Sequence, residues 1–389
     1  MSLHDHFLAA FGRPPEATAA APGRLEFIGN HTDYNGGLVM GVAIDRRVTV
    51  AAARRSDRAI GLASTSVTGT VTASLDAITP RAGAEAWANY VLGVLDSLIQ
   101  NGLNAPVGFD LAVTTDLPPG AGLSSSAAFE LATAHALAAL YGFRADAVTY
   151  ARLCRKAENH FVGMPCGLLD QGVCAYARAD HLVQIDCHTE AFSRVPLPPG
   201  LRFHVINTPH KHSLVDSLYA TRNRECQEAF AALRQRFPDL PCLAHATPQQ
   251  VEDTAAQMSP EAANRARHVT AENARVKAVA TSLENGDITA VGRLLTASHN
   301  SSRELFDNSV EQLDFLVEAL QDAPGVYGCR LTGGGFGGAV MALTDETFSA
   351  SRFEAINAAF ADRFGQPATH LNVATGNGAN VIDGPSALL

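Results

Sequence analysis

Polar side chains crowd into the segment GRLEFIGNHTDYNGG, residues 23–37, close to the start of the chain. Arg24, Asn30, His31 and Asp33 lie here with only three large apolar residues between them. Amide, imidazole and carboxylate groups all donate or accept directed hydrogen bonds. Such a concentration of hydrogen-bonding groups is typical of the lining of a polar site, and it makes this segment the first candidate for chemistry.

A second candidate is PPGAGLSSSAA, residues 118–128, which lies between a strand-like and a helix-like stretch. Gly120 and Gly122 let the backbone approach a ligand closely. A helix N-terminus offers unpaired N–H groups and a partial positive charge, both suited to phosphate. Ser124, Ser125 and Ser126 add hydroxyls, one of them a candidate Mg²⁺ ligand. A Walker A loop is excluded because the GK[ST] ending is absent. On this stretch alone, an ordinary serine-capped helix remains the alternative.

The third candidate is LTGGGFGGAV, residues 331–340, which formally contains GxGxxG. A dinucleotide-binding fingerprint requires a helix directly afterwards, whereas AVMALT reads as a strand. The glycines therefore join two strands. Either they form a structural hairpin, or their backbone, at Gly334 and Gly335, forms a second wall of an anion pocket.

The composition excludes several classes of protein. The 389 residues are 47% hydrophobic and 17% charged, with a net charge of −10 and pI near 5.8, which excludes a disordered chain and a general nucleic-acid or anionic-membrane surface. Seven cysteines with no CxxC pair favour reduced thiols over a disulfide framework or a zinc site. No signal peptide or apolar run of bilayer length is found. We therefore expect a cytoplasmic protein.

Strand and helix patterns alternate through the first half of the chain. Residues 46–55, 108–118 and 181–187 read as strands. Residues 87–102, 124–142, 147–163 and about 215–237 read as helices. PLPPG, residues 196–200, is the most linker-like stretch. It predicts an N-terminal domain of residues 1–197, carrying the first two candidate segments, and a C-terminal domain of residues 198–389, carrying the third.

The three segments, in this order, resemble the three motifs of the GHMP small-molecule kinases, and the first narrows the resemblance to the galactokinase branch. WANYVLGV (87–94), KAENHFVGMPCGLLDQ (156–171), KHSLVDSLYATRNREC (211–226) and SHNSSRELFDNSVEQLD (298–314) agree with that branch. The resemblance implies a two-domain α+β fold with the active site in the inter-domain cleft. It also implies an enzyme, a monomer, that transfers the γ-phosphoryl group of ATP to the anomeric hydroxyl of a sugar, D-galactose.

The resemblance also implies roles for individual residues. Asp170 matches the catalytic aspartate, either as a base or as a group that orients the hydroxyl, and Arg24 matches its partner. Ser126 and Glu158 match the Mg²⁺ positions, although the serine run leaves Ser125 as an alternative. The backbone from Gly120 to Ser125, with Gly122 and Ser124, would hold the phosphates, as would Gly334 and Gly335. Trp87 lies in the stretch expected near adenine, with a role in the core as its alternative.

For the sugar, the resemblance implies Asp33 as acceptor for adjacent hydroxyls, together with His31, Tyr219 and the backbone of Gly167. Asn30 departs from the pattern, because galactokinases typically carry Glu there, expected at the sugar's C6 hydroxyl. Asn is neutral and both donates and accepts. The alternatives are therefore a relaxed or shifted sugar 1-kinase (for arabinose, galacturonate or another galactose-like sugar) or a non-catalytic sugar sensor. Asn223, in place of a usual second Arg, is a further departure.

Overall fold

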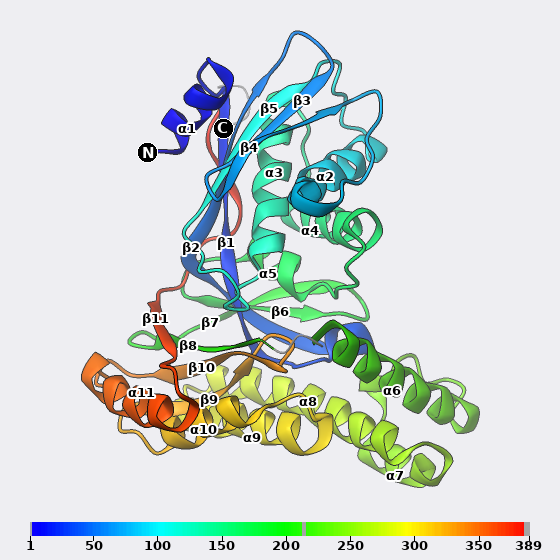
Figure 1. The fold of residues 1–389 in the computed structure, drawn as a ribbon. Helices are drawn as coiled ribbons and strands as arrows, with labels where there is room; N and C mark the ends of the chain where they lie inside the picture. The colour runs from blue at the N-terminus through cyan, green and yellow to red at the C-terminus, as the bar shows by residue number, and fades with distance from the viewer. Residues whose placement is uncertain (1, 212–214, 385–389) are drawn as a thin grey trace.

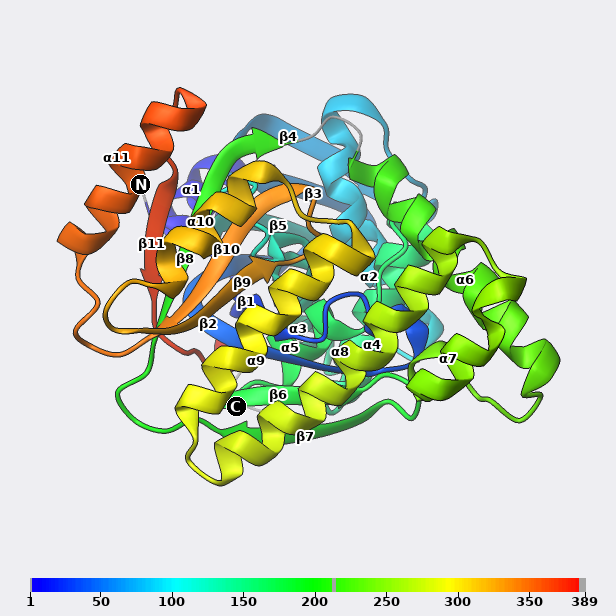
Figure 2. The same ribbon diagram turned by 90° about the horizontal axis from the view of Figure 1, so that it is seen from below.

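The structure, a computed structural model, describes residues 2–211 and 215–384. Residues 212–214, part of the stretch 211–226 noted above, lie outside the described residues. Two sheets with their helices form an upper and a lower part of the molecule in Figure 1, and Figure 2 views the lower part from below. Within the described ranges no helix has the length and apolar content to cross a bilayer. All seven cysteines are unpaired thiols, as predicted.

The first sheet is mainly antiparallel, in the order β12-β1-β2-β5-β3-β4, with β6 and β7 continuing from the other end of β2. Of its two long strands, β1 is rich in Ala and β2 in Ala and Val, and both are buried along most of their length. The strands are β1 (Ala17–Ile28), β2 (Leu38–Arg54), β3 (Ala59–Ser64), β4 (Val67–Ser74), β5 (Phe109–Thr115), β6 (His181–Asp186), β7 (Ala191–Pro196) and β12 (Asn380–Asp383).

Helices cover the first sheet on one face, and α1 lies against the other (Figure 1). The central helix α3 has buried residues on nearly its whole circumference, and it ends at Gly142 with φ 74°. An all-round apolar helix of this kind belongs inside a core. The helices here are α1 (Leu3–Phe11), α2 (Asn89–Gln100), α3 (Ser125–Tyr141), α4 (Ala147–Ala157) and α5 (Leu169–Tyr176), with η1 (Asp33–Asn35), η2 (Gly83–Ala88) and the π-helical turn η3 (Glu158–Val162).

The second sheet is antiparallel, in the order β11-β8-β10-β9. Helices α9 and α10 pack on β9, whereas inward residues such as Phe203 continue the core of the first domain. The strands are β8 (Arg202–Lys211), β9 (Val326–Thr332), β10 (Gly337–Thr344) and β11 (Thr369–Val373). The helices are α6 (Val215–Arg236), α7 (Pro248–Thr254), α8 (Pro260–Glu284), α9 (Ile288–Ser301), α10 (Glu311–Gln321) and α11 (Ala350–Phe364), with η4 (Leu243–His245), η5 (Ala255–Gln257) and the π-helical turn η6 (Ser302–Phe306).

The two sheets meet through a shared apolar core. Phe27 of β1 and Phe203 of β8 are in edge contact, with ring centroids 6.2 Å apart. The chain passes from one sheet to the other between β7 and β8, at the linker-like stretch 196–200. The last strand, β12, pairs with β1 and so returns to the first sheet. We propose this division into domains, with residues 198–373 forming the second domain and β12 added to the first.

Candidate active site

The turn after β1 is held in an unusual backbone conformation. Gly29 and His31 have φ of 105° and 59°, values that are uncommon for residues other than glycine. The Thr32 hydroxyl contacts the carbonyls of Gly29 and Leu38, at 2.8 and 2.6 Å. Asn35 donates to the His31 carbonyl at 2.7 Å. Part of the polar segment therefore stabilises its own turn, and this turn presents the neighbouring side chains to the cleft.

Asp170 and Arg24 form the central ion pair. Asp170 lies in the first turn of α5, and its Oδ1 accepts from Nε and Nη2 of Arg24 at 2.9 and 2.6 Å. Its Oδ2 accepts from the Ser124 hydroxyl at 2.6 Å, and Arg24 also donates to the Gly122 carbonyl at 2.6 Å. Burial alone would lower the pKa of Arg24, but the charge of Asp170 raises it. The predicted pair is thus formed, and it is joined to the first glycine-rich loop.

The two glycine-rich loops face each other. Gly122 and Gly333 have φ of 68° and 80°, a region that favours glycine. A Cβ on Gly333 would lie 3.9 Å from the Gly122 carbonyl, and one on Gly122 would lie 3.9 Å from the Thr332 carbonyl. Ser124 precedes α3 in the left-handed region, at φ 54°, and its side chain makes no capping hydrogen bond. The helix N-terminus is therefore not closed by its own serine, which favours the phosphate alternative over the serine-capped helix.

Glu158 begins the π-helical turn η3 beside this loop. Burial and then the charge of Asp170 raise its pKa, while hydrogen bonds from Cys166 and Ser126 oppose the rise. Gln171 donates to it as well. No group of three His, Cys, Asp or Glu side chains among the described residues forms a metal cage. One carboxylate and one hydroxyl suit Mg²⁺ nonetheless, because Mg²⁺ keeps waters and phosphate oxygens as its other ligands.

Asp33 lies at the sugar side of the site, against the backbone of Gly167. A Cβ on Gly167 would lie 1.8 Å from the Asp33 Oδ2, so only glycine fits there. Burial, followed by the charges of Glu26 and Asp170, raises the pKa of Asp33 to about 7. Asp33 is half-buried and lines the cavity, so its ionised carboxylate can accept hydrogen bonds from a ligand there.

His31 is neutral and held by the protein. Its Nε2 lies 3.1 Å from the Gly334 carbonyl and therefore carries the proton, whereas Nδ1 accepts from the Tyr34 hydroxyl at 2.9 Å. Burial lowers its pKa to about 3. Its ring stacks on Phe306 and lies 5.1 Å from the Tyr219 ring, centroid to centroid. Because both nitrogens have protein partners, His31 can contact a sugar mainly through its ring.

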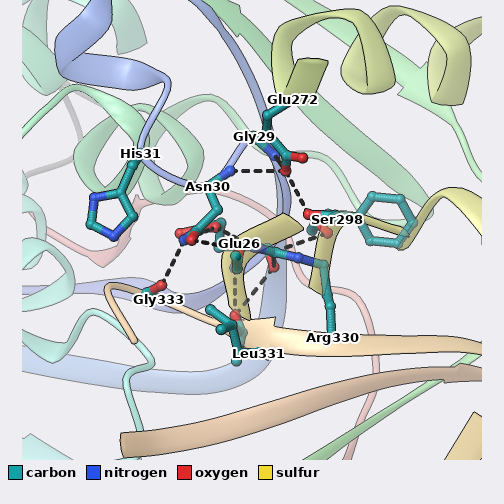
Figure 3. Close-up of polar contacts among 12 residues, drawn as sticks. Glu26, Gly29, Asn30, His31, Glu272, Ser298, Arg330, Leu331 and Gly333 are labelled. Atoms are coloured by element: carbon teal, nitrogen blue, oxygen red, sulfur yellow. Dashed lines mark hydrogen bonds and ion pairs between the residues drawn. The ribbon is translucent and has the colours of Figure 1, made fainter. Parts of the chain in front are cut away.

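Asn30 occupies the centre of a buried network between the domains (Figure 3). Its Nδ2 donates to the Glu26 carboxylate and to the Gly333 carbonyl, both at 2.9 Å. Its Oδ1 accepts from Asn308 at 2.8 Å and from Ser302 at 3.1 Å. The sequence-based expectation placed this side chain at the C6 hydroxyl of the sugar. In the structure, protein partners occupy its two N–H groups and its oxygen.

One cavity of about 970 Å³ covers the sugar side of the site and the central ion pair. Predicted residues among its lining are Arg24, Asn30, His31, Asp33, Gly167, Asp170, Tyr219 and Gly334. Gly120, Gly122, Ser124, Ser125, Ser126, Glu158 and Gly335 do not line it. Gly335 instead packs closely on Asn308, whose carbonyl would lie 2.2 Å from an added Cβ. Trp87 stacks near Phe129 against the main core, with centroids 6.4 Å apart, as in the alternative stated for it.

Sequence reasoning missed two buried groups of this site. Arg330, fully buried on β9, donates to the Glu26 carboxylate at 3.0 Å. Glu130, also fully buried, accepts from Gln171 at 3.1 Å, and Gln171 in turn donates to Glu158. A signal existed in each case. Arg330 is a single charge inside an otherwise apolar strand, and Glu130 is a single charge inside an Ala-rich helix.

Known protein families and a known relative are similar to this chain in sequence. The galactokinase galactose-binding signature matches residues 5–54, and the N-terminal and C-terminal GHMP kinase domains match residues 89–178 and 279–362. A galactokinase from Roseiflexus sp. (strain RS-1) is 38% identical over 367 residues, which cover 94% of this chain and 93% of that relative. The chain belongs to the galactokinase family. The family assignment made from the three motifs is therefore confirmed.

Solved structures agree with this assignment. Lactococcus lactis galactokinase, solved in complex with galactose, superposes with a TM-score of 0.93 at 30% identity, covering 97% of this chain and 98% of that one. The predicted α+β GHMP kinase fold is thus confirmed. The mevalonate kinase of Methanococcus jannaschii superposes with a TM-score of 0.67 at 17% identity, over 94% of this chain and 100% of that one, and shows the fold alone.

Proposed function

We propose that this galactokinase-family phosphotransferase transfers the γ-phosphoryl group of ATP to the anomeric hydroxyl of D-galactose, giving galactose 1-phosphate and ADP. ATP-dependent phosphorylation of galactose is the activity that membership of the family carries. The observation that supports the finer proposal is the position of Asp170. Its carboxylate lines the sugar-side cavity and is hydrogen bonded to Ser124, at the start of the helix beside the glycine-rich loop.

The chemistry follows from this position. The anomeric oxygen forms a bond to the γ-phosphorus, and the bond from that phosphorus to the β,γ-bridging oxygen breaks, so that its electron pair leaves with ADP. Asp170 accepts the hydroxyl proton or orients that hydroxyl, since phosphoryl transfer needs positioning more than covalent catalysis. Arg24 is paired with Asp170 and would lie beside the transferring charge.

The phosphates would lie between the two glycine-rich loops. Backbone N–H groups from Gly120 to Ser125 and the N-terminus of α3 would bind them. Ser126 and Glu158 would hold Mg²⁺, which would neutralise charge on the phosphates. The hydrogen bond between Ser126 and Glu158 brings these two ligand atoms together, and the charge of Asp170, which raises the pKa of Glu158, would be offset by a cation.

On the sugar side, Asp33 would accept hydrogen bonds from two adjacent hydroxyls, supported by the backbone of Gly167 and the ring of Tyr219. The first alternative keeps the chemistry but changes the sugar, to arabinose, galacturonate or another galactose-like sugar. The second is a non-catalytic sensor, which the complete set of Arg24, Asp170 and Glu158 disfavours.

The test is ADP release with Mg·ATP across a sugar panel of D-galactose, 2-deoxygalactose, N-acetylgalactosamine, glucose, L-arabinose and galacturonate. We expect a clear optimum for D-galactose. A faster rate with a sugar altered at C6 would contradict the substrate and support a shifted 1-kinase. Sugar binding without ADP release on any member of the panel would contradict catalysis and support the sensor.

A further inference from the structure

The side chain of Asn30 is saturated by the protein. A primary amide has two N–H donors and two acceptor lone pairs. A carboxylate oxygen and a backbone carbonyl accept from its two N–H groups (Figure 3). Two side chains donate to its oxygen. The partners also fix which atom is nitrogen, because the Gly333 carbonyl and the Glu26 carboxylate can only accept. With a residue exposure of 1%, Asn30 has little capacity left for a substrate hydroxyl.

The backbone of Asn30 is also bound to the second domain. Glu272 of α8 accepts from its N–H at 3.2 Å, and His268 of the same helix lies 3.1 Å from its carbonyl. Glu272 accepts from Ser298 of α9 as well, at 2.6 Å. Asn30 therefore connects the turn after β1 to α8, to η6 and to the glycine-rich hairpin. This is the geometry of a residue that positions others.

Glu26, four residues earlier, has the complementary geometry. Thr332 contacts its backbone N–H and carbonyl at 3.2 and 3.1 Å, which fixes the strand at this point. Its Oε1 accepts from Asn30 and from Arg330. Its Oε2 accepts no hydrogen bond from any of the described residues. This oxygen is also not one of their fully buried atoms that lack a partner, so it retains some exposure, and Glu26 lines the cavity. This oxygen of the carboxylate is therefore available to a ligand in the cavity.

The fully buried Arg330 explains why the carboxylate and the amide belong together. Arg330 donates to the Glu26 carbonyl at 3.2 Å and to its carboxylate at 3.0 Å. A buried guanidinium requires one compensating carboxylate. A Glu at position 30 in addition would place a second carboxylate against the first and against the Gly333 carbonyl. The site therefore accommodates one carboxylate and one amide at positions 26 and 30.

We propose that Glu26, and not Asn30, supplies the carboxylate that selects the sugar, by accepting a hydrogen bond from its C6 hydroxyl, and that Asn30 is a positioning residue for that carboxylate. The proposal rests on the sugar-kinase function proposed above and names the residue that determines specificity within it. The negative charge that the family typically has at position 30 is thus carried at position 26 in this chain.

The experiment compares kcat/KM for D-galactose, 6-deoxy-D-galactose and L-arabinose in the wild type and in Glu26→Gln. We expect the wild type to prefer D-galactose over both other sugars by about tenfold or more, the size of one lost hydrogen bond to a charged group. Glu26→Gln should reduce that preference several-fold, chiefly through the KM for D-galactose. Equal losses on all three sugars would overturn the proposal, because a purely structural role gives that result.

Asn30→Glu and the exchange Glu26→Gln/Asn30→Glu complete the design. Asn30→Glu puts two carboxylates together, so it should lower the Tm and reduce kcat/KM for all three sugars alike. The exchange restores one carboxylate and one amide, so it should recover much of the activity lost in the two single variants. If Glu26→Gln does not fold, the wild-type panel still decides, since equal rates with and without the C6 hydroxyl would overturn the proposal. A wild type inactive on every sugar would instead contradict the proposed function.

Discussion

Arg24 donates from two nitrogens to a single oxygen of Asp170, at 2.9 and 2.6 Å, and leaves the other oxygen to Ser124. The Arg24 side chain is 6% exposed, whereas that of Asp170 is 30% exposed. The guanidinium is therefore fixed inside the protein and the carboxylate is presented to the cleft. The cation pairs with the carboxylate from behind, so it does not block the access of the carboxylate to a hydroxyl.

We expect Asp170→Asn to lower kcat by about 10²- to 10⁴-fold, the range for loss of a positioned acid–base group, with sugar binding within about threefold of the wild type. The amide keeps the shape and an acceptor for Ser124 but cannot take the hydroxyl proton. Steady-state ADP release and calorimetric titration with sugar measure the two quantities. The control is Asp362→Asn, an exposed carboxylate on α11. Near-normal turnover in Asp170→Asn would remove Asp170 from the chemistry.

Ser126 and Ser125 are adjacent serines, and their alanine variants serve as test and control for the proposed Mg²⁺ site. Ser126 is hydrogen bonded to Glu158, whereas Ser125 is the exposed first residue of α3. Ser126→Ala should therefore raise the Mg²⁺ concentration for half-maximal rate by about tenfold, since it removes one ligand of a metal held by few protein groups. Ser125→Ala should change it by less than about threefold. Titrations of Mg²⁺ at saturating ATP give both numbers. A larger effect in Ser125→Ala would transfer the ligand role to Ser125.

The sequence predicted the parts of this molecule that depend on local pattern. The strand around 108–118 and the helix at 124–142 were found with ends within a few residues, because alternation and glycine caps are local signals. The strand predicted at 46–55 ends close to the observed end of β2, but β2 begins well before it, at Leu38. The helical prediction for 147–163 was correct in extent but not in type, because its last turn, from Glu158, is a π-helix. That turn is shaped by the packing of Phe161 against Gly93 of α2, which no local pattern records.

The sequence predicted which residues form the candidate site, but not which partners they have. Motif order indicated Arg24 and Asp170, and the structure brings them together. It could not show that Asn30 is saturated, because its partners Ser302, Asn308 and Gly333 are more than 250 residues away in the chain. Long-range partners of this kind depend on how the two domains pack.

Asp33 predicts a pH dependence of sugar binding. With its pKa raised to about 7, Asp33 is ionised above that pH and can then accept from two hydroxyls. Sugar affinity without nucleotide should therefore fall as the pH drops from 8 to 6, approaching tenfold per unit below the pKa. Calorimetry at half-unit intervals measures this. A flat profile would mean that Asp33 binds sugar equally well when protonated, or does not bind it.

The raised pKa of Asp33 also makes the stability of the folded protein depend on pH. Because the folded pKa of Asp33 lies above the ordinary value of 3.8, the folded state holds this proton more tightly than the unfolded state. Asp33 therefore favours folding at low pH, and that contribution is lost as the pH rises through about 7. Asp33→Asn should raise the Tm by roughly 2–5 °C at pH 8 and by much less at pH 5. Thermal unfolding at both values checks this, with the exposed Asp45→Asn as control.

Glu130 is expected to act as a neutral acid. Burial, followed by the charge of Glu158, raises its pKa well above the ordinary value, which favours the protonated form. Glu130→Gln replaces one neutral group with another of the same shape and retains an acceptor for Gln171. We therefore expect kcat/KM within about threefold of the wild type from pH 6 to 8, because no charge is removed. Glu158→Gln in the same assay should raise the Mg²⁺ requirement instead.

The pH dependence of stability distinguishes a protonated Glu130 from an ionised one. A raised folded pKa favours folding below that pKa and loses its contribution as the pH rises through it. Glu130→Gln should therefore be at least as stable as the wild type in urea at pH 7, and more stable at pH 9. A loss of stability at pH 7 that grows with pH would show that Glu130 is ionised in the folded protein. Gln171 would then donate to two charged carboxylates, and the buried cluster would need a cation even without ATP.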